Sequence, residues 1–321
     1  MKAIGLTSLE LCAGGGGQAL GLEQAGFEHQ GLVEIDRQCC ETLRFNRPHW
    51  HVFQKDIENF DGRPFKGIDL LAGGLPCPPF SVAGKQLGKA DERNLFPAAI
   101  RLIDEIRPRA IIIENVRGLL DAIFDDYRNY VSGQIAKLGY MTGWNLLNAS
   151  DYGVPQLRPR VIFVAIKNGF GQYFDWPATH KISPPTVGET LFDLMALRGW
   201  LGATAWRKRA NGIAPTIVGG SKKHGGPDLG PTRARKAWAA LGVDGLVIAD
   251  AAPDCDFVGM PRLTVPIVAR LQGFPNEWIF SGKKTPAYRQ VGNAFPPPVA
   301  HAVAECVADA LTIRRLVSAA S

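Results

Sequence analysis

The chain has 321 residues, of which 46% are hydrophobic, so it can fill the core of one large domain and a smaller one. No apolar run is long enough to span a membrane, and the six cysteines show neither a disulfide framework nor a zinc-binding CxxC pair. These features argue against membrane and disulfide-stapled proteins and indicate a reducing cytoplasm and no metal site. We expect the apolar start to form a strand rather than a signal peptide, because Glu10 interrupts it and glycines follow.

The net charge of +6 is concentrated in one segment. Residues 196–243 contain nine basic side chains and a single acidic one, Asp228. Such a segment favours a polyanionic partner, such as a nucleic acid. A solvated basic surface would give the same count, so charge alone does not decide between the two.

Short apolar runs alternate with helical periodicity up to residue 166. The expected strands are 7–11, 32–36, 69–72, 110–113 and 161–166. The expected helices are 18–25, 38–44, 94–106 and 127–138. Continuous apolar runs are typical of strands that are buried on both faces. The alternation therefore predicts an α/β fold with a doubly wound, mostly parallel, Rossmann-like sheet.

Glycines and prolines punctuate the chain after residue 166, and only 233–241 keeps helical periodicity. We therefore expect a smaller, loop-rich domain over 196–284 that carries the basic segment. The helix expected at 299–316 has an apolar face and should return to the first domain, which would comprise 1–195 and 285–321.

A glycine-rich turn follows the first expected strand. It supplies Gly14-x-Gly16-x-x-Ala19, and Glu34 lies 20 residues beyond Gly14 at the end of the next strand. Glycines let a ligand lie against such a turn, and the acid can accept hydrogen bonds from ribose hydroxyls. The pattern fits NAD, FAD or an adenosyl cofactor, and a plain glycine turn is the alternative. Asp56 follows a possible third strand, where it could bind an adenine amino group or cap a helix.

Residues 73–81 read Gly-Gly-Leu-Pro-Cys-Pro-Pro-Phe-Ser and come directly after a buried strand. Proline has a fixed φ, so the three prolines remove much of the freedom of the loop around Cys77. A cysteine displayed in this way at a strand end is typical of a positioned nucleophile. A buried cysteine that acts as a small hydrophobic residue is the alternative.

Two further groups of polar residues adjoin apolar strands. Glu114 ends the run Ile111-Ile112-Ile113, with no neighbouring charge in the sequence, so a partly desolvated carboxyl group there could donate a proton near neutral pH. A strand-end carboxylate in water is the alternative. Gln156-x-Arg158-x-Arg160 precedes the strand at 161–166, and alternation would place all three on one face. Two adjacent guanidinium groups require anions or carboxylates, unless they lie on a solvated edge.

Taken in chain order, these motifs resemble those of the cytosine-C5 DNA methyltransferases of bacterial restriction–modification systems. The carrying motifs are the glycine turn, the Pro-Cys loop with Cys77, Glu114-Asn115-Val116 and Gln156-x-Arg158-x-Arg160. Further agreement comes from Arg262-Leu263-Thr264, from Ala-Arg-Leu-Gln-Gly-Phe-Pro at 269–275 and from Gln-Val-Gly-Asn-Ala at 290–294. The resemblance spans nearly the whole chain and leaves 196–262 idiosyncratic. It implies that the domain at 196–284 recognises the target.

The resemblance implies a covalent route to a carbon nucleophile. The thiolate of Cys77 would add to C6 of a cytosine flipped out of duplex DNA, while Glu114 protonates or hydrogen-bonds N3. Arg160 would lie near this site and Arg158 would brace it. Asn115 and Ser81 would hold the base or the backbone.

The implied cofactor is S-adenosyl-L-methionine, converted to S-adenosyl-L-homocysteine. Its methionine end would lie over the glycine turn, with Glu34 on the ribose and Asp56 on the adenine amino group. The full set of implied cofactor contacts is Cys12, Ala13, Gly14, Gly16, Gly17, Glu34, Ile35, Asp56, Ile57, Pro76, Asn293 and Ala294.

The implied partner is double-stranded DNA, bound by a monomer in the bacterial cytoplasm and at the nucleoid, with a cognate restriction endonuclease as a companion. Thr216-Ile217 resembles the Thr-Leu element that family members place near the flipped base. The expected DNA contacts are Gln156, Arg207, Lys208, Arg209, Thr216, Ile217, Lys222, Lys223, Arg233 and Arg235. The target sequence cannot be read from these residues.

Three positions depart from the family pattern without removing a catalytic group. Cys12 stands where an aromatic residue is usual, Pro266-Ile267 stands where Arg-Glu is usual, and Pro78 stands where many relatives have Gln. Three other functions stay open at this stage: a nicotinamide dehydrogenase, a catalytically silent DNA-binding module, and a methyltransferase that acts on tRNA.

Overall fold

The computed structural model describes residues 5–76, 94–220 and 226–320. Its contacts divide the chain into two units. The first unit comprises Met1–Leu147, Pro159–Ala178 and Val299–Ser321, and the second comprises Asn148–Arg158 and Thr179–Pro298. Four residues to which the sequence assigned a role lie outside the described ranges, namely Cys77, Ser81, Lys222 and Lys223.

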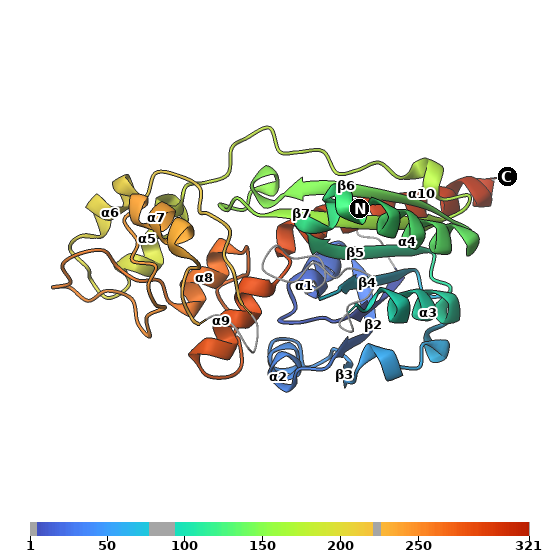
Figure 1. Ribbon diagram of the computed structural model, residues 1–321, viewed down its shortest axis with the longest axis horizontal. Coiled ribbons are helices and arrows are strands. Elements are labelled where there is room, and N and C mark those ends of the chain that lie inside the picture. The colour runs from blue at the N-terminus through green and yellow to red at the C-terminus, as the bar shows by residue number, and fades with distance from the viewer. Residues whose placement is uncertain (1–4, 77–93, 221–225, 321) are drawn as a thin grey trace. The chain divides into compact units, whose positions relative to one another are not determined.

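The first unit is built on a seven-stranded sheet with the order β3-β2-β1-β4-β5-β7-β6. The bounds are β1 Leu6–Leu11, β2 Phe27–Glu34, β3 Val52–Gln54, β4 Leu70–Gly74, β5 Ala110–Val116, β6 Tyr140–Asn148 and β7 Pro159–Lys167. Strands β3, β2, β1, β4 and β5 pair in parallel, and β7 pairs antiparallel with β5 (Figure 1). The doubly wound, mostly parallel sheet predicted from the sequence is confirmed.

The strand order reverses between β1 and β4, since β2 and β3 extend the sheet on one side and β4 and β5 on the other. Ligands of doubly wound sheets bind beyond the carboxyl ends of the strands at such a switch point. The last residues of β1, β2 and β4 are Leu11, Glu34 and Gly74, and Glu114 lies two residues before the end of β5. The topology therefore brings the glycine turn, the acid that ends β2, the segment that leads to Cys77 and the acid in β5 to one edge.

Helices cover the sheet because its strands present apolar side chains on both faces. The helices of this unit are α1 Gly17–Gln24, α2 Arg37–Asn46, α3 Phe96–Ile106, α4 Asp125–Lys137 and α10 Pro297–Ala320. Ile111 and Ile113 of β5 pack in one buried cluster with Leu102 and Ile103 of α3 and Ile135 of α4. Period-2 alternation turns the neighbouring strand residues to the opposite face, which explains the uninterrupted apolar run.

Helices are the regular elements of the second unit, and long irregular segments join them. Its helices are α5 Val187–Ala196, α6 Ala203–Arg209, α7 Thr232–Ala240, α8 Val265–Leu271 and α9 Lys284–Asn293. Helix α5 packs against α6 and α8, and α8 packs against α9, so the residues on both sides of 196–284 share its core. The sequence predicted only α7, because α6 and α8 are two turns long and too short to show periodicity.

Within the described ranges, none of the helices is both long and apolar enough to cross a membrane. The same ranges contain no group of three or more His, Cys, Asp or Glu side chains with the geometry of a metal site.

Candidate active site

The turn after β1 has an unusual backbone. Gly14 and Gly16 have φ of 54° and 89°, and Cys12 has φ of 54°, in the left-handed region that favours glycine. A residue with a side chain costs about 1–3 kcal/mol there and persists only where its surroundings hold it, which is common at ligand sites. The sequence analysis named Cys12 as an implied cofactor contact and as a departure from an aromatic position, but it did not show this strain.

Glu34 is fixed at the end of β2 by the turn itself. Its two carboxylate oxygens accept hydrogen bonds from the backbone N–H groups of Gly14 and Asp36, both at 2.7 Å. Burial raises the pKa of Glu34 and the charge of Asp36 adds to the rise, while the two N–H groups oppose it. The next residue, Ile35, is 63% exposed and offers an apolar surface beside this acid.

Two buried polar residues beside the turn were missed in the sequence. Glu10 of β1 and Gln18 of α1 are 1% and 4% exposed. Oε2 of Glu10 and both amide atoms of Gln18 have no hydrogen-bond partner among the described residues. Burial, aided by the charge of Glu34, raises the pKa of Glu10 well above its ordinary value. Glu10, which interrupts an apolar strand, was the signal that could have indicated these buried polar groups.

Asp56 caps a short helix with one of its carboxylate oxygens, which was one of the two roles expected from the sequence. Its Oδ1 accepts a hydrogen bond from the backbone of Glu58 at 2.9 Å and caps the short helix η1, Ile57–Asn59. Ile57 is 3% exposed and packs in the core, so only its backbone could contact a cofactor. Pro76 is exposed at the end of the described segment.

An ion pair occupies the carboxyl end of β5. Arg160 Nε lies 2.8 Å from Glu114 Oε1, and the side chains are only 13% and 9% exposed. The antiparallel register places Val116 opposite Arg160, so Glu114 and Arg160 are diagonal neighbours across the strands. The sequence suggested that Glu114 has no charged neighbour, whereas the pairing of β5 with β7 places Arg160 beside it.

Strand β4 leaves room for this carboxylate. Gly74 lies opposite Glu114 in the parallel register, and a Cβ at residue 74 would lie 3.4 Å from Glu114 Oε2. Asn115, 1% exposed, donates from Nδ2 to the carbonyl of Leu75 at 3.4 Å. Of its two expected roles, base or backbone, Asn115 therefore holds the backbone two residues before Cys77.

Arg158 is wholly buried in the second unit. Its guanidinium donates to the carbonyl oxygens of Ile217, at 2.7 Å, and of Gly292 and Ala294, both at 2.8 Å. One side chain therefore joins the Thr216-Ile217 element to the Gln-Val-Gly-Asn-Ala motif. The resemblance implied that Arg158 braces the catalytic site, and that role stays a prediction; its observed contacts are with these two segments of the second unit.

Gln156 joins the Ile217 segment to the Ala-Arg-Leu-Gln-Gly-Phe-Pro motif at 269–275. Its Oε1 accepts from the backbone N–H of Ile217 at 2.9 Å, and its Nε2 donates to Gln272 Oε1 at 2.8 Å. Gln156 and Ile217, expected to contact DNA, are both 0% exposed. The side chain of Gln156 and the backbone of Ile217 form this internal network, and neither residue is exposed at the surface.

Two glycines allow the recognition element and the late motif to touch. A Cβ on Gly292 would lie 2.4 Å from Cα of Gly219, so neither backbone could carry a side chain at this crossing. Beside it, exposed Asn293 donates from Nδ2 to the carbonyl of Gly220 at 3.1 Å, and Ala294 is buried.

The described basic residues of the expected DNA-contact set lie at the surface of α6 and α7. Arg207, Lys208 and Arg209 form the last turn of α6, where cations interact favourably with the helix dipole. Arg207 stacks over the ring of Phe192 at 5.2 Å, and Arg209 donates to the carbonyl of Ala239 at 3.1 Å. Arg233 is exposed and Arg235 is half-buried on α7.

A doubly wound sheet with a strained glycine turn and acids near the ends of β2 and β5 is typical of α/β enzymes whose ligands bind at the carboxyl ends of the strands. A sequence model of the C-5 cytosine-specific DNA methylase family matches residues 6–308, and the chain belongs to this family. The protein is therefore a C-5 cytosine DNA methyltransferase.

Relatives of known type cover almost the whole chain. The Type II methyltransferase M.NgoMIV of Neisseria gonorrhoeae is 57% identical over 309 residues, which are 95% of this chain and 98% of the relative. The Type II methyltransferase M.NaeI of Lentzea aerocolonigenes is 54% identical over 315 residues, 96% of this chain and 76% of the relative.

Solved structures agree on the fold. A DNA modification methyltransferase encoded within an Escherichia coli prophage has a TM-score of 0.68 at 22% identity, covering 96% of this chain and 99% of the other. A DNMT2 mutant from Spodoptera frugiperda has a TM-score of 0.65 at 18% identity, covering 94% and 99%. At these identities the likeness concerns the fold alone.

Proposed function

We propose that this enzyme transfers a methyl group from S-adenosyl-L-methionine to C5 of a flipped-out cytosine through a bond between Cys77 and C6. The observation that carries this proposal is the Glu114–Arg160 ion pair, which lies beside Gly74 at the end of β4. Cys77 follows Gly74 by three residues, and three residues of chain reach about 10 Å at most. A thiol and a carboxyl group within reach of one pyrimidine ring are the groups that this chemistry needs.

The transfer proceeds by covalent addition at C6, methyl transfer to C5 and elimination of Cys77. The thiolate of Cys77 adds to C6 while Glu114 hydrogen-bonds or protonates N3, so that electron density moves to C5. C5 then bonds to the methyl carbon and the methyl–sulfur bond breaks. A base removes the C5 proton, the bond between C6 and sulfur breaks, and Cys77 leaves as a thiolate. Arg160 would orient the Glu114 carboxyl group and bind the pyrimidine carbonyl.

The residues around the turn fit an adenosyl cofactor, which when bound supplies an electrophilic methyl group. Glu34 presents fixed carboxylate oxygens at the end of β2, where ribose hydroxyls would donate. Exposed Ile35 would pack on the adenine, and Asp56 would accept from its amino group. The unpartnered polar atoms of Glu10 and Gln18 support a polar ligand beside the turn. Asn293 remains a predicted contact of the same cofactor.

We further propose a short specific site in duplex DNA as the substrate, acted on by a monomer in the bacterial cytoplasm. The Type II names of the two relatives support a role in restriction–modification with a cognate endonuclease. An identity of 57% over 95% of the chain leads us to expect the same target as M.NgoMIV. Bisulfite sequencing of DNA from cells that express each enzyme tests this, and different methylated sites would refute it.

Trapping with 5-fluorocytosine tests the covalent route. With cofactor and a target duplex, the wild type should form an adduct that survives denaturation, because fluorine cannot leave as a cation. Cys77→Ala should form no adduct and transfer no methyl group, while it keeps its affinity for the duplex. An adduct with the variant, or normal turnover, would exclude the route. Equal methylation of a tRNA substrate would overturn the assignment to DNA.

A further inference from the structure

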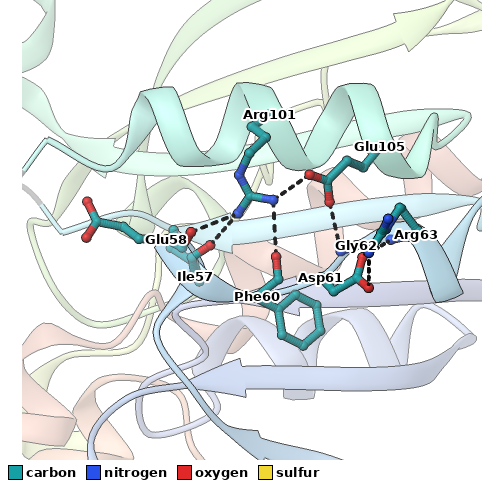
Figure 2. Close-up of polar contacts among 8 residues, drawn as sticks. All are labelled: Ile57, Glu58, Phe60, Asp61, Gly62, Arg63, Arg101 and Glu105. Atoms are coloured by element: carbon teal, nitrogen blue, oxygen red, sulfur yellow. Dashed lines mark hydrogen bonds and ion pairs between the residues drawn. The ribbon is translucent and has the colours of Figure 1, made fainter.

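Arg101 of α3 holds the segment that follows Asp56. Its Nη2 donates to the carbonyls of Ile57 at 2.8 Å and Glu58 at 3.3 Å, and its Nη1 donates to the carbonyl of Phe60 at 3.1 Å (Figure 2). A 3₁₀ helix leaves its last carbonyls without partners of its own. One planar guanidinium therefore satisfies carbonyls along η1 and beyond its end.

Glu105, one turn further along α3, completes the arrangement. Its Oε1 pairs with Arg101 Nη1 at 2.6 Å, and its Oε2 accepts from the backbone N–H of Gly62 at 2.9 Å. A Cβ on Gly62 would lie 2.8 Å from Ile106 and 3.0 Å from Leu102, so the backbone lies directly against the helix. We call Arg101 and Glu105 the α3 clamp, because they hold the segment at Ile57 and at Gly62.

The clamp acts on the residue that the proposed function assigns to adenine. Asp56 is covalently joined to Ile57, and its Oδ1 already accepts from Glu58 N–H within the same η1 turn. No described residue occupies the other oxygen, Oδ2, with a hydrogen bond. The orientation of Oδ2 is therefore set by a turn whose carbonyls are fixed by Arg101.

We infer that Arg101 is a positioning residue for adenine recognition, acting through η1 and Asp56. This inference rests on the proposed function, since it takes S-adenosyl-L-methionine as the ligand. Arg101 is part of neither the Glu114–Arg160 pair nor the Cys77 loop. Loss of the Arg101 guanidinium should weaken cofactor binding and reduce the preference for adenine over a base without the amino group. The turnover rate at saturating cofactor should stay the same.

The test compares Arg101→Met with Arg63→Met, a control from the same segment. Arg63 pairs with Asp61 at 2.8 Å, and both side chains are largely exposed, so its loss should change nothing. Calorimetry with S-adenosyl-homocysteine and S-inosyl-homocysteine measures recognition of the amino group. For Arg101→Met we expect about a tenfold rise in Kd for the adenosyl compound, with a smaller rise for the inosyl compound. Arg101→Lys should fall between, since an ammonium group lacks the planar fork.

Kinetics separate positioning from general destabilisation. The KM for cofactor should rise in Arg101→Met, while kcat and the KM for DNA stay within about twofold of the wild type. Glu105→Gln, which keeps an acceptor for Gly62, should show a weaker change in the same direction. Unchanged adenosyl affinity, or an equal loss for both compounds with a fall in kcat, would overturn the inference. A wild type that binds neither compound would instead refute the proposed function.

Discussion

Replacing Arg158 with methionine should destabilise the second unit strongly. The buried guanidinium donates three hydrogen bonds to the carbonyls of Ile217, Gly292 and Ala294. Bonds from a charged donor contribute about 1.5–3 kcal/mol each, and a buried carbonyl left without a partner costs about 1–3 kcal/mol. Methionine also removes the cost of burying the charge of Arg158, which offsets several kcal/mol of this loss. We therefore expect a net loss of about 3 kcal/mol in the free energy of unfolding.

Urea denaturation followed by tryptophan fluorescence measures this loss, because fully buried Trp238 belongs to the same unit. Arg262→Met is the matched control. Arg262 pairs with Asp244 at 2.7 Å but its side chain is 46% exposed, so removing it should cost about 1 kcal/mol or less. Equal shifts of the urea midpoint in the two variants would refute the bracing role of Arg158.

Two further predictions concern the first unit. Glu114→Gln and Arg160→Met should each lower kcat by about 100-fold or more. Because the two side chains act as one pair, kcat of the double variant should fall by less than the product of the two single losses. Fully multiplicative losses of kcat in steady-state methylation would contradict this. Burial lowers the pKa of His29 to about 4 from 6.5, and its neutral ring contacts Ser8 and the carbonyl of Ala19. Since the unfolded chain takes up this proton below pH 6.5 and the folded protein only near pH 4, stability should fall across that window as pH drops, by up to about 3 kcal/mol. His29→Gln should flatten this dependence in thermal melts, and an unchanged slope would argue against it.

The parallel part of the sheet could be predicted because its strands are continuous apolar runs. Residues 110–113, for example, are buried on both faces, and the observed strand β5 extends three residues further, to Val116. Strand β6 was missed, because its residues are mostly half-buried and give no such run. Helix α5 was missed although Thr186 and Glu189 form a capping box that the sequence displays.

The sequence named candidate site residues but could not give their contacts. Glu114 and Arg160 were both named, yet their ion pair depends on the antiparallel register of β5 and β7, which no local pattern specifies. The resemblance led us to expect Gln156 at the DNA, and its burial depends on partners more than sixty residues away in sequence. The clamp of Arg101 could not be foreseen either, since its acceptors are backbone carbonyls, which every residue has.

The crossing of Gly219 and Gly292 bears on how such enzymes could be re-engineered. A designer who grafts a foreign specificity segment into this scaffold must choose where within the variable region, 196–262, the graft begins. A graft that includes position 219 must keep a residue without a side chain there, because its counterpart is fixed in a motif about seventy positions downstream. Chimeras that start after Gly220 should therefore fold more often than those that replace Gly219 as well.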